Sequence, residues 1–77
     1  MLYDEHFKDS CKKLGSHIKN LREIKKLTVQ NISKITGIRA EYIKKIESGK
    51  AYGVLIDKHL LKIAKALNVK MSELFDF

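Results

Sequence analysis

Apolar residues recur at intervals of three and four along most of this chain of 77 residues, and no proline interrupts them. This spacing places the apolar side chains on one face of an α-helix, whereas the strict alternation typical of strands is missing. Four glycines divide the pattern into segments too short for long antiparallel hairpins. The sequence therefore predicts an all-α domain, an orthogonal bundle of four to five short helices.

Two helices are predicted in the first half of the chain. The first covers residues 10–26. Its apolar face comprises Cys11, Leu14, Ile18, Leu21 and Ile24. The second begins after Thr28, a favourable N-cap, and turns Ile32 and Ile35 inward. It ends at Gly37, which can adopt the left-handed conformation that closes a helix.

Three helices are predicted in the second half. The third covers Ala40–Ser48 and is closed by Gly49. Its inward residues are Tyr42, Ile43 and Ile46. The fourth is capped by Asp57 and ends at Asn68. Its core face comprises Leu60, Leu61, Ile63, Ala64 and Leu67, and its outer stripe Lys58, Lys62 and Lys65. The short fifth helix is anchored by Met71, Leu74 and Phe75.

Composition argues against several classes of protein. One cysteine, Cys11, and three scattered histidines provide neither an internal disulfide nor the spacing of a metal site, and no cofactor is expected. No spacing suggests a nucleophile with a base or a pair of catalytic carboxylates, so we do not expect an enzyme. No apolar run approaches the ~18 residues of a membrane helix, and no signal peptide begins the chain, so we expect a cytoplasmic protein.

The charge favours an anionic partner. Lysine and arginine total 16 against 9 aspartates and glutamates, a net charge of +7, and both halves of the chain contribute. Such an excess favours nucleic acid first and an acidic membrane surface second. A solvated, lysine-rich surface without a partner would have the same composition.

The predicted second and third helices are joined by a tight turn around Gly37, which is helix-turn-helix geometry. In this motif the second of the two helices enters the DNA major groove. Its outward face would present Arg39, Ala40, Glu41, Lys44, Lys45 and Ser48. Arginine and lysine can donate to guanine, glutamate can accept from cytosine, and alanine can contact a thymine methyl group. If the face is only solvated, Glu41 and Lys45 form an ordinary i, i+4 pair.

The ordered series LGSHIKNLREIKKLTVQNISKITGIRAEYIKKIESGK and HLLKIAKALNVKMSELF resembles the phage repressor-like (Cro/CI-type, XRE) helix-turn-helix domains over about residues 14–75. The resemblance implies a lambda repressor-like DNA-binding domain over residues 14–77. Residues 1–13 would then form an N-terminal extension, with a short helix near Tyr3–Asp9.

The resemblance also implies roles for single residues. Arg22 and Glu47 match the family's buried ion pair. The positions that match base-reading residues are Arg39, Ala40, Glu41, Lys44 and Lys45. Those that match phosphate contacts are Thr28, Gln30, Ser48, Gly49 and Lys50. The chain departs from the family at Val29, where a glutamine usually touches the DNA backbone, at Ser33, where an alanine usually packs, and in a longer loop after Lys50 that lacks the usual proline.

A second resemblance leaves an alternative open. The run TGIRAEYIKKIESGKAY is also similar to the N-terminal domain of the bacterial cell-shape protein RodZ, which keeps the helix-turn-helix fold but docks onto a cytoskeletal filament. The lysine excess favours DNA, and the transmembrane helix of that protein is missing here.

We therefore predict a sequence-specific, DNA-binding transcription regulator that binds double-stranded DNA with its third helix. We expect a homodimer on a two-fold operator, with half-sites about 34 Å apart. The apolar candidates for self-association are Leu55, Ile56, Leu74, Phe75 and Phe77. We expect no small-molecule ligand and no membrane association.

Overall fold

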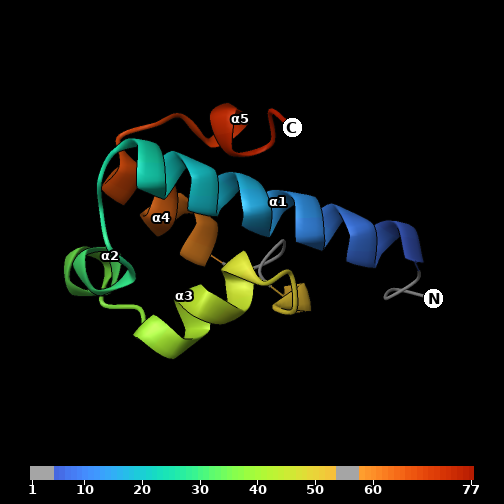
Figure 1. The fold of residues 1–77 in the computed structure, drawn as a ribbon, viewed down its shortest axis with the longest axis horizontal. Helices are drawn as coiled ribbons and strands as arrows, with labels where there is room; N and C mark the ends of the chain where they lie inside the picture. Colours follow the sequence, from blue (N-terminus) through green and yellow to red (C-terminus); the bar gives the residue numbers. More distant parts are fainter. Residues whose placement is uncertain (1–4, 54–57) are drawn as a thin grey trace.

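The computed structural model describes residues 5–53 and 58–77. The helices of these residues are α1 (Glu5–Ile24), α2 (Val29–Thr36), α3 (Ala40–Glu47), α4 (His59–Leu67) and α5 (Met71–Leu74). In Figure 1, α1 runs along the length of the molecule, with α3 on one side of it and α5 on the other. The prediction of an all-α bundle with a helix-turn-helix is confirmed.

Helix α1 is longer than predicted, because it begins at Glu5 and continues without a break to Ile24. The residues expected in a separate short helix are therefore part of α1 as far as the structure describes them. Glu5 lies in the first turn, where a negative charge interacts favourably with the helix dipole. The burial of Cys11 shows that the early turns of α1 already contribute to the core.

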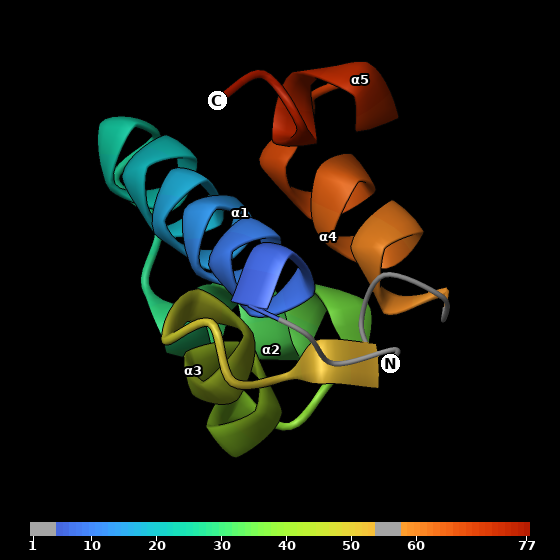
Figure 2. The ribbon, with the colours of Figure 1, turned by 90° about the vertical axis from the view of Figure 1, so that its right-hand side faces the viewer.

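The core lies where α1 packs on α3 and α5, and where α2 packs on α3 and α4. Its largest fully buried side chains are Leu14, Ile18, Ile32, Ile43, Ile46, Ile63, Leu67 and Leu74. In Figure 2, α1 crosses the middle of the view, with α2 and α3 below it and α4 and α5 to its right. The core therefore draws on every helix and fixes α3 from its inner face.

Three residues predicted to lie in the core are exposed instead. Ile24, Ile35 and Leu61 expose 75%, 61% and 47% of their surface. An α-helix turns about 100° per residue, so a step of three residues falls about 60° short of a full turn. Ile24 lies two such steps after Ile18, and Ile35 lies two such steps after Val29. Because neither series contains a step of four residues, these two side chains lie outside the buried face of their helices. Leu61 directly follows buried Leu60 and so points to another side.

The C-terminal segment also differs from the prediction. Leu74 alone anchors α5, whereas Met71 and Phe75 are exposed. The ring of Phe77 lies 6.1 Å from that of His17 on α1, centroid to centroid. Leu74 is therefore buried within the monomer and not available for self-association. Two other candidates, Leu55 and Ile56, lie outside the described residues, as does the predicted cap Asp57.

Gly15 allows α1 and α3 to approach closely. A Cβ atom at this position would clash with the backbone carbonyl oxygens of Ile46 and Glu47 at the end of α3. Because backbone atoms cannot swing aside like a flexible side chain, any larger residue would push the two helices apart. The position of α3 relative to α1 thus depends on a residue without a side chain.

Candidate nucleic-acid interface

Helix α2 begins with a capping box. The hydroxyl oxygen of Thr28 accepts a hydrogen bond from the backbone N–H of Asn31 at 3.0 Å, and the Asn31 side chain accepts one from the Thr28 N–H at 2.9 Å. The Thr28 cap is therefore confirmed. Thr28 and Gln30 are exposed at this end of the helix, whereas the side chain of Val29 is buried. The structure thus leaves Thr28 and Gln30 accessible to a phosphate.

The turn between α2 and α3 is fixed by a small network of hydrogen bonds. Gly37 closes α2 with a left-handed φ of 77°, and its N–H donates to the Ser33 carbonyl at 2.8 Å. The Ser33 hydroxyl donates to the carbonyl of Ile38 at 2.5 Å. The Thr36 hydroxyl donates to the Ile32 carbonyl and accepts from the Ile38 N–H. Ile38 is itself buried, so the turn presents α3 at one defined angle.

Burial of Ile43 and Ile46 sets the rotation of α3 about its axis. The helix therefore turns a charged face to solvent. The exposed residues on and beside it are Arg39, Glu41, Lys44, Lys45 and Ser48. Ala40 differs from the other predicted base-reading residues, because it is half-buried and packs against the core.

The loop after α3 holds the remaining predicted phosphate contacts. The Ser48 hydroxyl donates to the Lys45 carbonyl at 2.8 Å and so closes α3. Gly49 is buried, has a φ of 81°, and lies against the backbone of Lys12 on α1. Lys50 is exposed. In this loop, Ser48 and Lys50 therefore face solvent, and Gly49 packs against α1.

The structure brings Arg22 and Glu47 together in a two-pronged ion pair. The Arg22 Nε and Nη2 donate to the two carboxylate oxygens of Glu47 at 2.7 and 3.0 Å, and Nη1 donates to the Leu27 carbonyl at 2.9 Å. The two side chains are only 12% and 7% exposed. The hydrogen bond to Glu47 raises the pKa of Arg22 above its already high ordinary value. The pair therefore joins α1 to the end of α3 and engages the Glu47 carboxylate.

Lys19 is a candidate that the sequence analysis missed. A hollow of about 250 Å³ between α1 and α3 is lined by Lys19, Lys44, Glu47 and Ser48. Lys19 lies one turn before Arg22 on α1, so its place on the face that meets α3 could have been inferred from the ion pair. Since Arg22 already neutralises Glu47, Lys19 and Lys44 add positive charge to the edge of the α3 surface.

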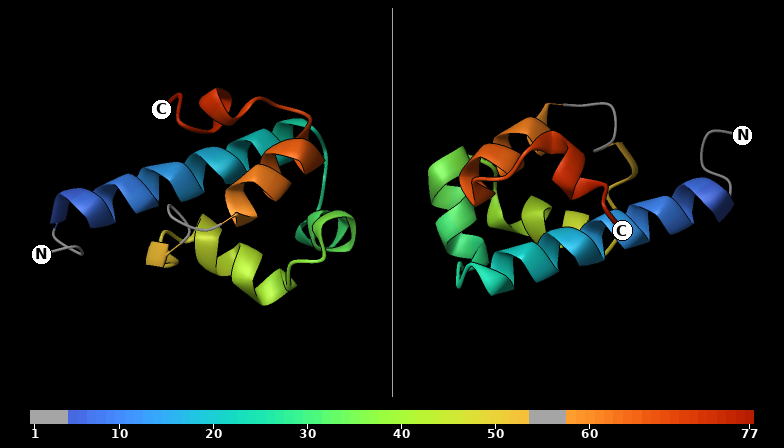
Figure 3. Two further views of the ribbon diagram at one scale, coloured as in Figure 1. Left: turned by 180° about the vertical axis from the view of Figure 1, so that it is seen from behind. Right: turned by 90° about the horizontal axis from the view of Figure 1, so that it is seen from above.

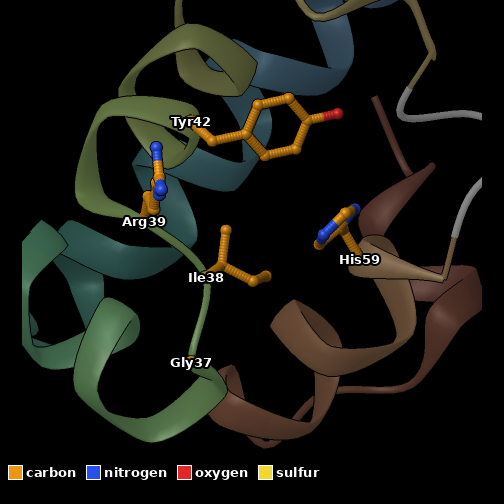
Figure 4. A pocket seen from close by; sticks show the side chains of 5 residues that line it. All are labelled: Gly37, Ile38, Arg39, Tyr42 and His59. Carbon is orange, nitrogen blue, oxygen red and sulfur yellow. The ribbon is translucent and has the colours of Figure 1, made fainter.

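A second hollow, of about 330 Å³, lies beside the turn (Figure 4). It is lined by Gly37, Ile38, Arg39, Tyr42 and His59. The rings of Tyr42 and His59 lie 5.0 Å apart, which connects α3 to the start of α4. This ring contact therefore adds a second support for α3, separate from the Arg22–Glu47 pair.

Two further properties limit the chemistry of the described residues. They contain no cluster of three or more histidine, cysteine or acidic side chains that could hold a metal ion. Within the same residues, no helix is long and apolar enough to cross a membrane.

Comparison with known proteins identifies the arrangement. A family model described as a helix-turn-helix domain matches residues 15–76. The crystal structure of the restriction-modification controller protein C.AhdI from Aeromonas hydrophila superposes with a TM-score of 0.72 at 26% sequence identity, over 84% of this chain and 96% of that one. No curated protein matches the sequence.

Proposed function

Because the chain belongs to the XRE-type helix-turn-helix family, we propose that it is a sequence-specific DNA-binding transcription regulator whose α3 lies in the major groove. One observation carries the proposal. Buried isoleucines and the Arg22–Glu47 pair hold α3 rigidly, while its outer face presents Arg39, Glu41 and two lysines. A rigid helix with such a face suits the readout of base edges.

The residues around α3 suit phosphate binding. Thr28 and Gln30 at the start of α2 and Ser48 and Lys50 after α3 are exposed at the two ends of the motif. Lys19 extends this basic rim onto α1. Phosphate contacts of this kind fix the register of the protein on the duplex, and base contacts then supply the specificity.

A regulatory role is supported by the similarity to the controller protein C.AhdI. We further propose that the chain acts as a homodimer, since one such motif reads only a few base pairs and paired half-sites lie about 34 Å apart on one face of the duplex. Phe75 and Phe77 remain exposed candidates for the contact between two copies.

The proposal is tested by measuring affinity for random duplex DNA across salt concentrations. We expect log K to fall steeply with log salt, by about 0.9 for each phosphate neutralised. Lys50→Ala should weaken all sequences alike and reduce this slope by about 1, whereas Lys44→Ala should relax the preference for a selected operator. Lys13→Ala, an exposed position on α1, is the matched control. A flat salt response would refute DNA binding and favour docking onto a protein.

A further inference from the structure

The segments that form α2 and α4 are basic and contain no acidic residue. The sequence has no aspartate or glutamate between Glu23 and Glu41, nor between Asp57 and Glu73. These two segments carry Lys25, Lys26, Lys34, Arg39, Lys58, Lys62, Lys65 and Lys70. Since α2 and α4 pack against each other, as Figure 3 shows from behind, their outer sides form one continuous surface. A positive field of this kind attracts an anionic partner.

The same surface also exposes apolar side chains. A hollow of about 250 Å³ is lined by Ile35, Thr36, Lys62, Lys65 and Ala66. Ile35 is 61% exposed, and Ala66 on α4 is half-buried. We name the α2/α4 surface by the residues that line this hollow: Ile35, Thr36, Lys62, Lys65 and Ala66. It combines the apolar side chains of Ile35 and Ala66 with two lysines.

Duplex DNA does not account for this combination. The groove-reading face proposed above belongs to α3, and Figure 2 shows α3 and α4 on different sides of α1. Phosphates would attract Lys62 and Lys65, but the sec-butyl group of Ile35 gains nothing from a phosphate backbone. It gains from burial against apolar groups, by about 25 cal/mol for each Å² removed from water. The chemistry of the surface therefore fits a protein better than a nucleic acid.

We propose that the α2/α4 surface binds an acidic, amphipathic helix of a partner protein. One face of that helix would place leucine-like side chains on Ile35 and Ala66, in the helix-in-groove mode. Its glutamates or aspartates would meet Lys62 and Lys65, whose segment contains no acidic residue between Asp57 and Glu73. This charge complementarity steers the encounter and fixes the orientation of the bound helix. The inference does not depend on DNA binding by α3.

The probe is a synthetic amphipathic peptide with leucines on one face and glutamates on the other, titrated into the full chain labelled with ¹⁵N. A peptide with every glutamate replaced by lysine is the ligand control. We expect amide shifts at Ile35, Thr36, Lys62, Lys65 and Ala66 with the acidic peptide only. The double variant Lys62→Glu/Lys65→Glu should weaken binding about tenfold, since like charges at an interface repel.

Two control variants separate a specific contact from general attraction. Lys12→Glu/Lys13→Glu lowers the net charge by the same amount at exposed positions on α1, outside both basic segments, so it should retain nearly all of the affinity. Ile35→Ser, also at an exposed position, should weaken binding without unfolding the chain.

Three outcomes would overturn the proposal. The first is equal weakening by both pairs of charge reversals, which would indicate attraction to net charge alone. The second is a set of shifts centred on α3 that duplex DNA competes away, because the peptide would then only imitate DNA. The third is seen by sedimentation in the absence of peptide: the wild type self-associates and Ile35→Ser does not. The surface would then bind a second copy of this chain.

Discussion

Replacing Glu47 by glutamine should destabilise the chain strongly, although the two side chains have nearly the same shape. Glutamine retains one carbonyl oxygen, but its amide group would face a guanidinium nitrogen of Arg22, where a carboxylate oxygen now accepts at 2.7 or 3.0 Å. The positive charge of Arg22 would then remain in a site only 12% exposed. We expect about 3 kcal/mol of lost stability, near the lower end of the range for removing one partner of a buried ion pair.

That loss would be a large part of the whole stability. A chain of this length is expected to have a free energy of unfolding of about 4–12 kcal/mol, from ~0.05–0.15 kcal/mol per residue. Urea denaturation followed by circular dichroism measures the change directly. In a thermal scan, the midpoint should fall by about 15 °C, because ~1 kcal/mol corresponds to ~4–8 °C for a domain of this size.

Two companion variants make the reasoning refutable. Arg22→Met/Glu47→Leu removes both charges, so it should cost far less than the two single changes added together. Asp9→Asn breaks the exposed Lys13–Asp9 pair, whose atoms lie 3.2 Å apart and whose side chains are 61% exposed. It should cost about 0.5 kcal/mol or less. If Glu47→Gln cost no more than Asp9→Asn, the ion pair would not hold α1 to α3.

Three other predictions concern the scaffold. Gly15→Ala should destabilise by about 1–3 kcal/mol in urea denaturation, whereas Gly53→Ala, with no heavy atom within 4 Å of the new methyl group, should not; equal stability of the two would contradict the close packing of α1 on α3. Ser33→Ala should cost about 1 kcal/mol, since it leaves the Ile38 carbonyl without its hydroxyl donor; an unchanged midpoint would show that the bond contributes nothing. Burial raises the pKa of the Cys11 thiol above its ordinary value of 9.0, so the folded chain keeps this proton at a pH where the unfolded chain loses it. The stabilisation by the protonated thiol is complete below the pKa of the unfolded chain and is lost as the pH rises through the pKa of the folded chain. The stability advantage of the wild type over Cys11→Ala should therefore shrink above pH 9.0. A difference in stability that stays constant with pH would refute this prediction.

The helix ends could be predicted because they depend on local chemistry. Thr28 caps α2 with its own hydroxyl, Gly37 closes it with a positive φ, and Asn68 closes α4 with a φ of 59°. Each residue type favours that role whatever surrounds it. The start of α1 was predicted too late, because Asp9 and Ser10 are residue types that often cap a helix, whereas α1 begins at Glu5 and runs through both.

The side chains that face the core were predicted less well than the helix ends. An apolar residue type does not by itself show where a side chain lies around the helix axis. In α2, Val29 is buried and Ile35 exposed, although isoleucine is the more apolar of the two by size. Two steps of three residues, from Val29 through Ile32, place Ile35 about 120° from Val29 around the helix and so outside the core. Ile35 is part of the α2/α4 surface, so this error in the core prediction marks the candidate docking site.

The candidate DNA interface depends partly on contacts between distant segments, which spacing cannot reveal. Arg22 and Glu47 are 25 residues apart, and only the resemblance to a known family suggested their pairing. Lys19 was missed because its role follows from the crossing of α1 over α3, which Gly15 permits. Ala40 was assigned to base reading from its place on the helix, but its side chain packs partly against the core.

Selection of bound sequences from a pool of random duplex DNA tests the central claim most directly, when it is performed with the wild type and with a Glu41→Ala/Lys44→Ala variant. Both residues are exposed on α3, so the variant should fold normally. We predict that the wild type enriches a short two-fold motif, and that the variant loses its preference at a few defined positions while it still binds duplex DNA. If the wild type enriched no motif, or if the variant enriched the same one, α3 would not be the helix that reads DNA.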